Sequence, residues 1–243
     1  MDRRIYDRRD VGEKHIWRSA LLKDMPRLIF IVEGDAEQHF INSHLVDYLS
    51  QKFPGTGMHA QKITTNRQMN KKGGNVSYAL FQNELRRTAA QGNVMITTMV
   101  DFFRIPNDFP GYSTDVRTID VMENNIRTDC SAIIAPQFFL PYIQKHEFEA
   151  LLFANPSGFS NILDAKGLNQ VTKIVKDYGN PEDIDGGVDT APSKRLASIF
   201  DYRKVADSLL VMSDVSIDKL RSACPRFNEW VGRLECALTN GRF

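Results

Sequence analysis

Acidic side chains stand at the ends of two hydrophobic runs in this sequence. The run RLIFIVE, residues 27–33, ends in Glu33, and the run NVMITTMVD, residues 93–101, ends in Asp101. Glu37 follows Glu33 by four residues, which places it one helical turn away on the same side if a helix follows the first run. Each run therefore delivers a carboxylate at its last residue, and Glu37 adds another beside the first.

Two further acids, Glu147 and Glu149, follow the apolar segment SAIIAPQFFLPYI, residues 131–143. In a parallel α/β sheet, ligands bind outside the carboxyl ends of the strands. If the three runs are strands of one such sheet, up to five carboxylates converge there, and cations must neutralise their mutual repulsion.

Oxygen ligands suit hard cations such as Mg²⁺ or Mn²⁺. Two such ions about 4 Å apart can stabilise the attacking and leaving oxygens of phosphoryl transfer. The alternative for any single acid, Asp35 included, is a helix cap or a favourable charge at a helix N-terminus.

The elements that would position these acids alternate between strand and helix patterns, which indicates parallel pairing through crossover helices. The expected strands are 27–33, one within 58–65, 93–101 and 131–143, and the expected helices are 35–53, 76–91, one near 113–129 and one that opens with 146–153. After about residue 155 only short helical patterns remain. We therefore expect an α/β fold with a mostly parallel sheet flanked by helices, in residues 25–155. We expect residues 156–243 to form a C-terminal helical region that packs on the same domain, and residues 1–24 to be an extension that is disordered or contacts a partner.

The composition is that of an ordinary globular protein, with 42% hydrophobic and 25% charged residues among 243. No apolar run approaches the roughly 18 residues that cross a bilayer, and the charged first residues lack the apolar core of a signal peptide. Three widely spaced cysteines, Cys130, Cys224 and Cys236, favour a reducing cytosol and argue against a thiolate zinc site. A net charge of +1 excludes a strongly basic coat but allows a local basic groove. We expect a cytoplasmic protein with no membrane partner.

Four segments, in order, resemble a known family. VEGDAEQHF (32–40) resembles the first motif of the Toprim fold, and TTMVDFFRIPNDFPG (97–111) is similar to its second, DxD-like motif. LPYIQKHEFEALLF (140–153) and TAPSKRL (190–196) resemble a family of small bacterial stand-alone Toprim-like proteins, related to the nucleases of the overcoming-lysogenisation-defect (OLD) type. The resemblance covers roughly residues 26–205 and implies a Toprim-like fold.

The resemblance also implies a divalent-metal site for Mg²⁺ or Mn²⁺. Its expected ligands are the acids at the strand ends: Glu33, Glu37, Asp101 and Glu149, with Glu147 beside them. Among these, Glu33, Asp101 and Glu149 are the expected catalytic acids. A DxD motif would place a second aspartate at position 103, where this chain has Phe103. Some OLD-type nucleases also lack that acid, so the departure argues against topoisomerase chemistry rather than against catalysis.

A nuclease also needs positive charge near the scissile phosphate. Lys194 and Arg195 in APSKRL, and Lys204 in YRK, belong to the helical region, which could fold back over the acids. The resemblance implies a catalytic lysine downstream of the acids, either Lys194 or Lys204; the alternative for each is a solvated helix-surface lysine. The segment RQMNKKGGN (67–75) either presents backbone amides to a phosphate or is a plain turn.

Two features near the acids bear on substrate binding. His146 directly precedes Glu147, the first of the acids Glu147 and Glu149, and could position substrate or water. The loop 102–113 is rich in aromatic residues: Phe102, Phe103, Phe109 and Tyr112. These rings could stack on a nucleic-acid base, but we expect them to pack the loop onto its own domain.

The resemblance implies a metal-dependent nuclease that cuts DNA or RNA, as the effector of a bacterial anti-phage defence system with an ABC-type ATPase partner. The chain has no GxxxxGK[ST] phosphate loop of its own. One alternative is a catalytically inactive Toprim-derived binding or regulatory subunit of such a complex, which Phe103 and the near-neutral charge favour. Another is a phosphatase-like hydrolase of small phosphoesters. The segment VDFFR argues against it, because it lacks the DxDx[TV] arrangement of the nucleophile. The choice between DNA and RNA, and the number of copies that assemble, stay open.

Overall fold

The computed structural model describes residues 26–243 apart from 67–70, 73–75, 104, 185–186 and 214. The predicted extension, residues 1–24, lies outside the described residues. So does most of the segment 67–75, of which only the strand Lys71–Lys72 is described.

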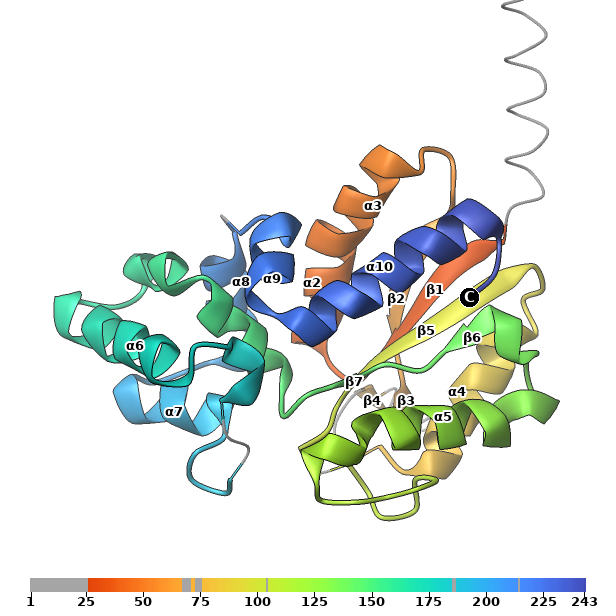
Figure 1. The fold of residues 1–243 in the computed structure, drawn as a ribbon, viewed down its shortest axis with the longest axis horizontal. Coiled ribbons are helices and arrows are strands. Elements are labelled where there is room, and N and C mark those ends of the chain that lie inside the picture. Colours follow the sequence, from red (N-terminus) through yellow and green to blue (C-terminus); the bar gives the residue numbers. More distant parts are fainter. Residues whose placement is uncertain (1–25, 67–70, 73–75, 104, 185–186, 214) are drawn as a thin grey trace, which may run out of the picture.

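A parallel sheet forms the centre of the fold, with the strand order β2-β1-β5-β6 and with β7 also paired to β5 (Figure 1). Every pairing in this sheet is parallel. Its strands are β1 (Arg27–Val32), β2 (Met58–Lys62), β5 (Val94–Asp101), β6 (Phe139–Leu140) and β7 (Ile143–Gln144). Strand β1 is buried from Leu28 to Val32, as expected for a parallel strand covered on both faces. The predicted α/β class is confirmed.

Helices cover both faces of the sheet, and the side chains of β1 alternate between them. Leu28, Phe30 and Val32 pack into the core shared with α2 (Asp35–Phe40), α3 (Val46–Lys52) and α10 (Pro225–Asn240). Ile29 and Ile31 pack into the core shared with α4 (Tyr78–Ala89) and α5 (Ile119–Asp129). In Figure 1 these two sets of helices lie above and below the sheet.

The predicted strand 131–143 is wrong in its extent. Its first part forms two short 3₁₀ turns, Cys130–Ala132 and Pro136–Phe138, and only β6 and β7 pair with β5. Pro141 separates these two strands because proline has no N–H to give to the ladder. The hydroxyl of Thr98 bridges the break, since it accepts a hydrogen bond from Tyr142 N (2.8 Å) and donates one to Tyr142 O (3.0 Å).

The predicted helix 35–53 forms, but a π-helical turn at Ile41–Leu45 separates α2 from α3. One side chain in α2 and one within this turn reach the edge strand β2. Gln38 Nε2 donates to Ala60 O (2.9 Å), and Asn42 Oδ1 accepts from Ala60 N (2.8 Å). Both backbone groups of Ala60 on the outer side of the sheet are thereby hydrogen bonded.

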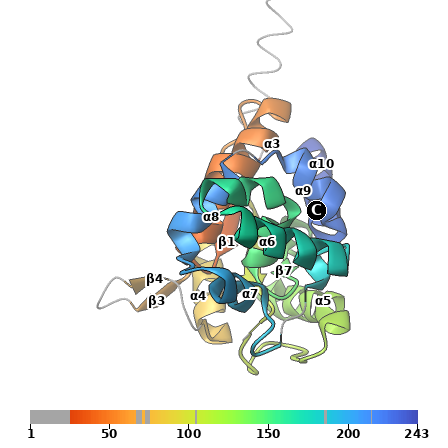
Figure 2. The same ribbon diagram turned by 90° about the vertical axis from the view of Figure 1, so that its left-hand side faces the viewer.

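The remaining elements are mostly helical. The helix expected at 146–153 is a 3₁₀ helix, Phe148–Ala154. The helix expected near 113–129 begins only at Val116. Asp115 caps it, because its side chain accepts a hydrogen bond from Arg117 N (2.9 Å). A 3₁₀ helix at Pro156–Asn161 is followed by α6 (Ala165–Tyr178), α7 (Pro192–Ile199), α8 (Lys204–Met212) and α9 (Ile217–Ala223). Helices α6, α7 and α8 lie together on one side of the molecule (Figure 2).

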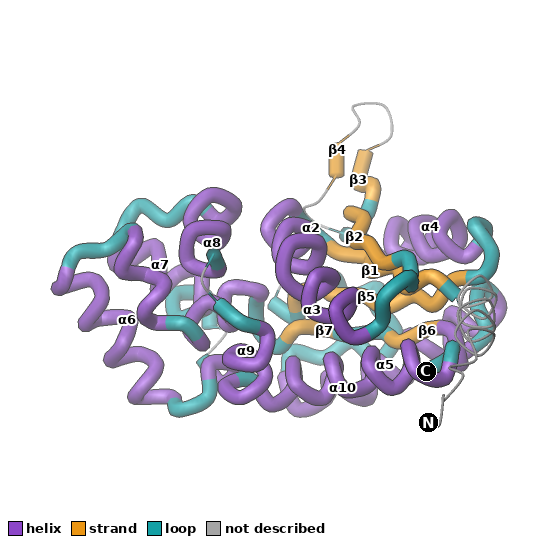
Figure 3. Tube along the Cα trace, turned by 90° about the horizontal axis from the view of Figure 1, so that it is seen from above, coloured by secondary structure: helices purple, strands orange, loops and turns teal. Residues whose placement is uncertain are grey.

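A small antiparallel pair, β3 (Thr64–Asn66) with β4 (Lys71–Lys72), projects from the body of the sheet (Figure 3). The strand predicted within 58–65 is confirmed as β2, and a break at Ile63 separates it from β3, which belongs to the second sheet.

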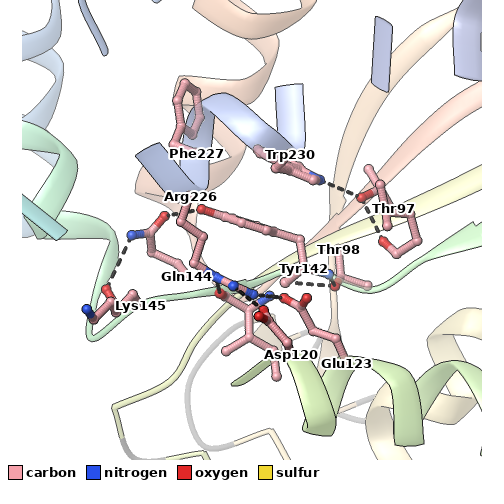
Figure 4. Close-up of polar contacts among 12 residues, drawn as sticks. Thr97, Thr98, Asp120, Glu123, Tyr142, Gln144, Lys145, Arg226, Phe227 and Trp230 are labelled. Atoms are coloured by element: carbon pink, nitrogen blue, oxygen red, sulfur yellow. Dashed lines mark hydrogen bonds and ion pairs between the residues drawn. The ribbon is translucent and has the colours of Figure 1, made fainter. Parts of the chain in front are cut away.

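A buried polar network fastens the C-terminal helix α10 to the sheet (Figure 4). Trp230 Nε1 donates to Thr97 Oγ1 in β5 (2.9 Å), and its ring stacks on Tyr142 with the centroids 4.3 Å apart. Arg226 forms an ion pair with Glu123 of α5 (2.5 Å) and donates to Ile143 O of β7 (3.3 Å). The last helix thus holds the two strands that lead to Asp101 and to the acids after Gln144.

Candidate functional site

Strand pairing brings the predicted acids to one edge of the sheet. Glu33 directly follows β1, and Asp101 is the last residue of β5, its parallel neighbour. Strand β7 pairs with β5 through Asp101 and Gln144, so the chain leaves the sheet there and enters the 3₁₀ helix that carries Glu149. Glu37 is in α2, which begins just after β1. We call Glu33, Glu37, Asp101 and Glu149 the carboxylate cluster.

Lys204, the first residue of α8, points its ammonium group into the carboxylate cluster. Its Nζ lies 2.7 Å from Glu37 Oε1, 3.4 Å from Glu149 Oε2 and 3.5 Å from Asp101 Oδ2. The side chain of Lys204 remains 40% exposed, while those of Glu37 and Glu149 are only 2% exposed. One partly accessible cation therefore neutralises acids that are almost completely buried.

Two oxygens of the cluster lack hydrogen bonds. Glu37 Oε2 and Glu149 Oε2 are buried and accept no hydrogen bond from any described group, although the second lies within ion-pair distance of Lys204. Such unsatisfied oxygens are costly and call for a functional explanation. Glu37 Oε2 also lies directly against Gly34, where a Cβ atom would be only 2.6 Å from it.

Burial and mutual repulsion raise the pKa values of the acids. Burial raises the pKa of Glu33, and Glu37 raises it further, while Lys204 and a backbone hydrogen bond from Asp101 lower it. The pKa of Asp101 is well above its usual value, mainly because of burial and against the effect of Lys204. Burial raises the pKa of Glu149 to about 7. Burial lowers the pKa of Lys204, but the nearby carboxylates raise it more, so the lysine stays charged.

Further contacts fix these groups in place. Asp101 Oδ1 accepts a hydrogen bond from Phe148 N (2.8 Å), which ties the end of β5 to the 3₁₀ helix that carries Glu149. The hydroxyl of Tyr202 lies 3.4 Å from Glu149 Oε1 and 2.9 Å from Ser208 Oγ. Tyr202 and Phe148 were not predicted as site residues from the sequence. The only sequence signal for Tyr202 is its place two residues before Lys204.

The structure places two other predicted site residues outside the cluster. Glu147 uses both carboxylate oxygens on α7, where it accepts hydrogen bonds from Ser193 N (2.9 Å) and Ser193 Oγ (3.1 Å). Glu147 is close enough to raise the pKa of Glu149, but both of its own carboxylate oxygens already accept hydrogen bonds. Lys194 is exposed on α7 and has no ion pair with a carboxylate of the described residues. Of the two candidate lysines, Lys204 is the one that meets the acids.

The aromatic loop after Asp101 divides into two groups. Phe102 and Phe109 are buried in the core that contains α4 and α5, which confirms the predicted packing for these two rings. Tyr112 is 42% exposed, so the packing expectation is wrong for it. Tyr112 and Phe103 line a pocket with His146.

The carboxylate cluster has the chemistry of a site for a hard divalent cation. Within the described parts of the chain, no three His, Cys, Asp or Glu side chains are already arranged as ligands of one ion. The donor set nevertheless fits Mg²⁺ or Mn²⁺, because it is all oxygen and two of its buried oxygens have no hydrogen bond. The residues that could hold such an ion are the four of the cluster.

Fold and site together define an α/β protein with a buried acidic cluster at the carboxyl edge of a parallel sheet. Residues 32–235 match the family described as "Domain of unknown function (DUF4276)", and because this is most of the chain, the protein belongs to that family. All four acids of the cluster and Lys204 lie within the matched span. The comparisons with curated proteins and with solved structures found no match. None of the helices in the described ranges has the length and apolarity needed to cross a membrane.

Proposed function

We propose that this protein is a nuclease that hydrolyses phosphodiester bonds with the help of Mg²⁺ or Mn²⁺ at the carboxylate cluster. The observation that carries the proposal is that acids from several parts of the sheet edge are buried around one ammonium, with Glu37 Oε2 and Glu149 Oε2 unsatisfied. Keeping such a cluster is costly for a fold that needs no cation there.

The residues of the cluster take separate roles in this proposal. Glu33, Glu37, Asp101 and Glu149 hold the metal, which when bound supplies Lewis-acid stabilisation of the phosphoryl oxygens. Lys204 is partly exposed and sits on the first turn of α8, so its ammonium can turn from the carboxylates toward the negative charge of a phosphate. Tyr202 and Phe148 position Glu149 and Asp101 through their hydrogen bonds.

The resemblance of four ordered segments to Toprim-like proteins supports the same function. It extends the proposal to a cytoplasmic effector of bacterial anti-phage defence that works with an ABC-type ATPase. Glu147 remains a candidate ligand by resemblance, but its bonds to Ser193 favour a structural role.

A second candidate function is a regulatory subunit without catalysis. It is favoured by the ion pairs of Lys204, which compensate the acids within the folded chain itself. In that case the cluster is a structural salt-bridge network that binds no divalent ion.

The deciding experiment measures cleavage of plasmid DNA, single-stranded DNA and tRNA with Mg²⁺ or Mn²⁺. Wild type is compared with Glu33→Gln and Glu149→Gln, and with Asp47→Asn, an exposed acid on α3, as the control. We expect the two cluster variants to lose on the order of 100-fold in rate, the size typical for an electrostatic group of an active site, and the control to match wild type. Equal cleavage by wild type and both cluster variants would contradict the proposed site. No cleavage by wild type, together with no Mn²⁺ binding in calorimetry, would favour the regulatory subunit.

A further inference from the structure

An open pocket of about 510 Å³ lies beside the carboxylate cluster. The loop after β5 supplies most of its lining, and His146 also lines it. Phe102 and Ile105 are buried, at 7% and 8% exposure, whereas Tyr112 is 42% exposed. The pocket therefore combines a buried apolar lining with an accessible aromatic ring.

The backbone joins this pocket directly to the acids. Phe102 and Phe103 are the two residues after Asp101, and His146 is the residue before Glu147. Phe103 N donates to His146 O (2.7 Å), which continues the pairing of β5 with β7 past the ends of the strands. Since successive Cα atoms are 3.8 Å apart, Phe103 Cα lies within about 8 Å of Asp101 Cα. The pocket and the carboxylate cluster are therefore built on adjacent residues of the same backbone segments.

The lining suits a flat, uncharged ring. None of the described residues that line the pocket is a lysine or arginine, and its one carboxylate, Asp115, is already paired with Arg117 (2.6 Å). The aromatic rings of the lining can stack on a nucleobase. The hydroxyls of Ser113 and Thr114, which also line the pocket, can form hydrogen bonds with the edge of the base.

We propose that this pocket binds an unpaired nucleobase of the strand whose phosphodiester lies at the carboxylate cluster, with the exposed ring of Tyr112 as the main stacking surface. The inference rests on the proposed nuclease function and names its substrate class. A base inside a duplex is paired at its edge and stacked on both faces, so it reaches a pocket only when it is unpaired or turned out of the helix. The substrate is therefore single-stranded nucleic acid, or a strand with an extruded base.

The test is a binding titration with a short single-stranded DNA that carries one 2-aminopurine, in Ca²⁺ so that the strand is held without being cut. The fluorescence of this base falls when it stacks. Tyr112→Ala removes the ring, Tyr112→Phe keeps it, and Val121→Ala, an exposed apolar residue on α5, is the matched control. The same strand with an abasic site, and the same strand in a duplex, complete the series.

We expect Tyr112→Ala to weaken binding about tenfold, within the range found for one base–aromatic stack, while Tyr112→Phe and Val121→Ala bind like wild type. The abasic strand and the duplex are expected to bind more weakly than the intact strand. Equal binding of the intact and abasic strands, undiminished binding by Tyr112→Ala, or no binding of any strand by wild type would overturn the proposal.

The outcomes separate this inference from the proposed hydrolysis. Base-dependent binding that Tyr112→Ala weakens, without metal-dependent cleavage, would leave the pocket as a nucleobase site and refute the nuclease. Cleavage that is lost in Glu33→Gln but does not depend on the base or on Tyr112 would support the nuclease and refute the pocket.

Discussion

Lys204 Nζ lies 2.7 Å from Glu37 Oε1, although the two residues are far apart in the sequence. This ion pair joins α8 to α2 across the carboxyl edge of the sheet. It explains how acids that repel one another are buried together in the folded protein. It also makes α8 part of the site, because the packing of this helix decides where the positive charge is.

Removing the charge of Lys204 should destabilise the metal-free protein. Breaking a buried ion pair typically costs about 3–5 kcal/mol, but Lys204 is 40% exposed, and water screens part of this loss. We expect Lys204→Met to lower the free energy of unfolding by about 2 kcal/mol in urea titrations. Lys194→Met, an exposed lysine on α7, should change it by less than about 0.5 kcal/mol. Mn²⁺ should stabilise Lys204→Met more than wild type; an unchanged stability of this variant would show that the lysine does not hold the cluster.

Adding a methyl group at Gly34 should displace the carboxylate of Glu37. The new Cβ would lie 2.6 Å from Glu37 Oε2, so the buried side chain must move. We expect Gly34→Ala to bind Mn²⁺ at least about tenfold more weakly in calorimetry, and to lose about 1–3 kcal/mol of stability through overpacking. The control is Gly232→Ala in α10, where a Cβ meets no atom within 4 Å and helix propensity should add about 0.5–1 kcal/mol. Unchanged Mn²⁺ affinity in Gly34→Ala would remove Glu37 from the ligand set.

The raised pKa of Glu149 should make the metal-free protein less stable as pH rises. In the folded chain this pKa is about 7, against 4.5 for an ordinary glutamate, so between these values the folded state binds a proton that the unfolded state has lost. The free energy of unfolding therefore falls between about pH 4.5 and pH 7, by at most about 3 kcal/mol from this group.

Glu149→Gln should remove this share of the pH dependence in urea titrations across the same window. The pKa of Glu33 would stay raised, and that of Asp101 would stay raised by burial but lose the part that the charge of Glu149 contributes. Glu229→Gln, an exposed acid in α10, should leave the wild-type profile unchanged. A Glu149→Gln profile as steep as that of wild type would contradict the prediction.

Arg226 should stabilise the attachment of α10 mainly through Glu123. The carboxylate of Glu123 is 11% exposed and also accepts from Ile143 N (2.7 Å), so it stays buried when its cation is removed. We expect Arg226→Met to cost about 3 kcal/mol in urea titrations. Arg226→Met combined with Glu123→Gln should cost less than the sum of the two single changes, because glutamine keeps an acceptor for Ile143 N without a buried charge. Strict additivity would show that the two side chains are not energetically linked.

The acids at the ends of β1 and β5 were predictable because their strands are fully buried and therefore appear as unbroken apolar runs. Parallel pairing of neighbouring strands then places Glu33 and Asp101 at the same edge. The interruption at Pro141 had a local signal, the proline itself, whereas the π-helical turn at Ile41–Leu45 has no comparable mark in the sequence.

The choice between Lys194 and Lys204 could not be made from local patterns. It depends on how α8 packs on the 3₁₀ helices that precede α6. Asn155 Nδ2 donates to Val211 O of α8 (3.1 Å), and Gly158 lies so near that a Cβ there would be 2.2 Å from the same oxygen. These contacts join residues far apart in the sequence, and they decide which lysine reaches the acids.

The two side chains that hydrogen bond Ala60 also affect how this protein can meet other chains. Strand β2 is an outer strand of the sheet, and an open strand edge can recruit a further strand from a peptide or from another copy of the protein. At Ala60 both backbone groups are already bonded to Gln38 and Asn42. An incoming strand would have to displace both amide side chains before it could add to the sheet. Gln38 and Glu37 are neighbours in α2, so an incoming strand would meet the helix that carries one acid of the carboxylate cluster.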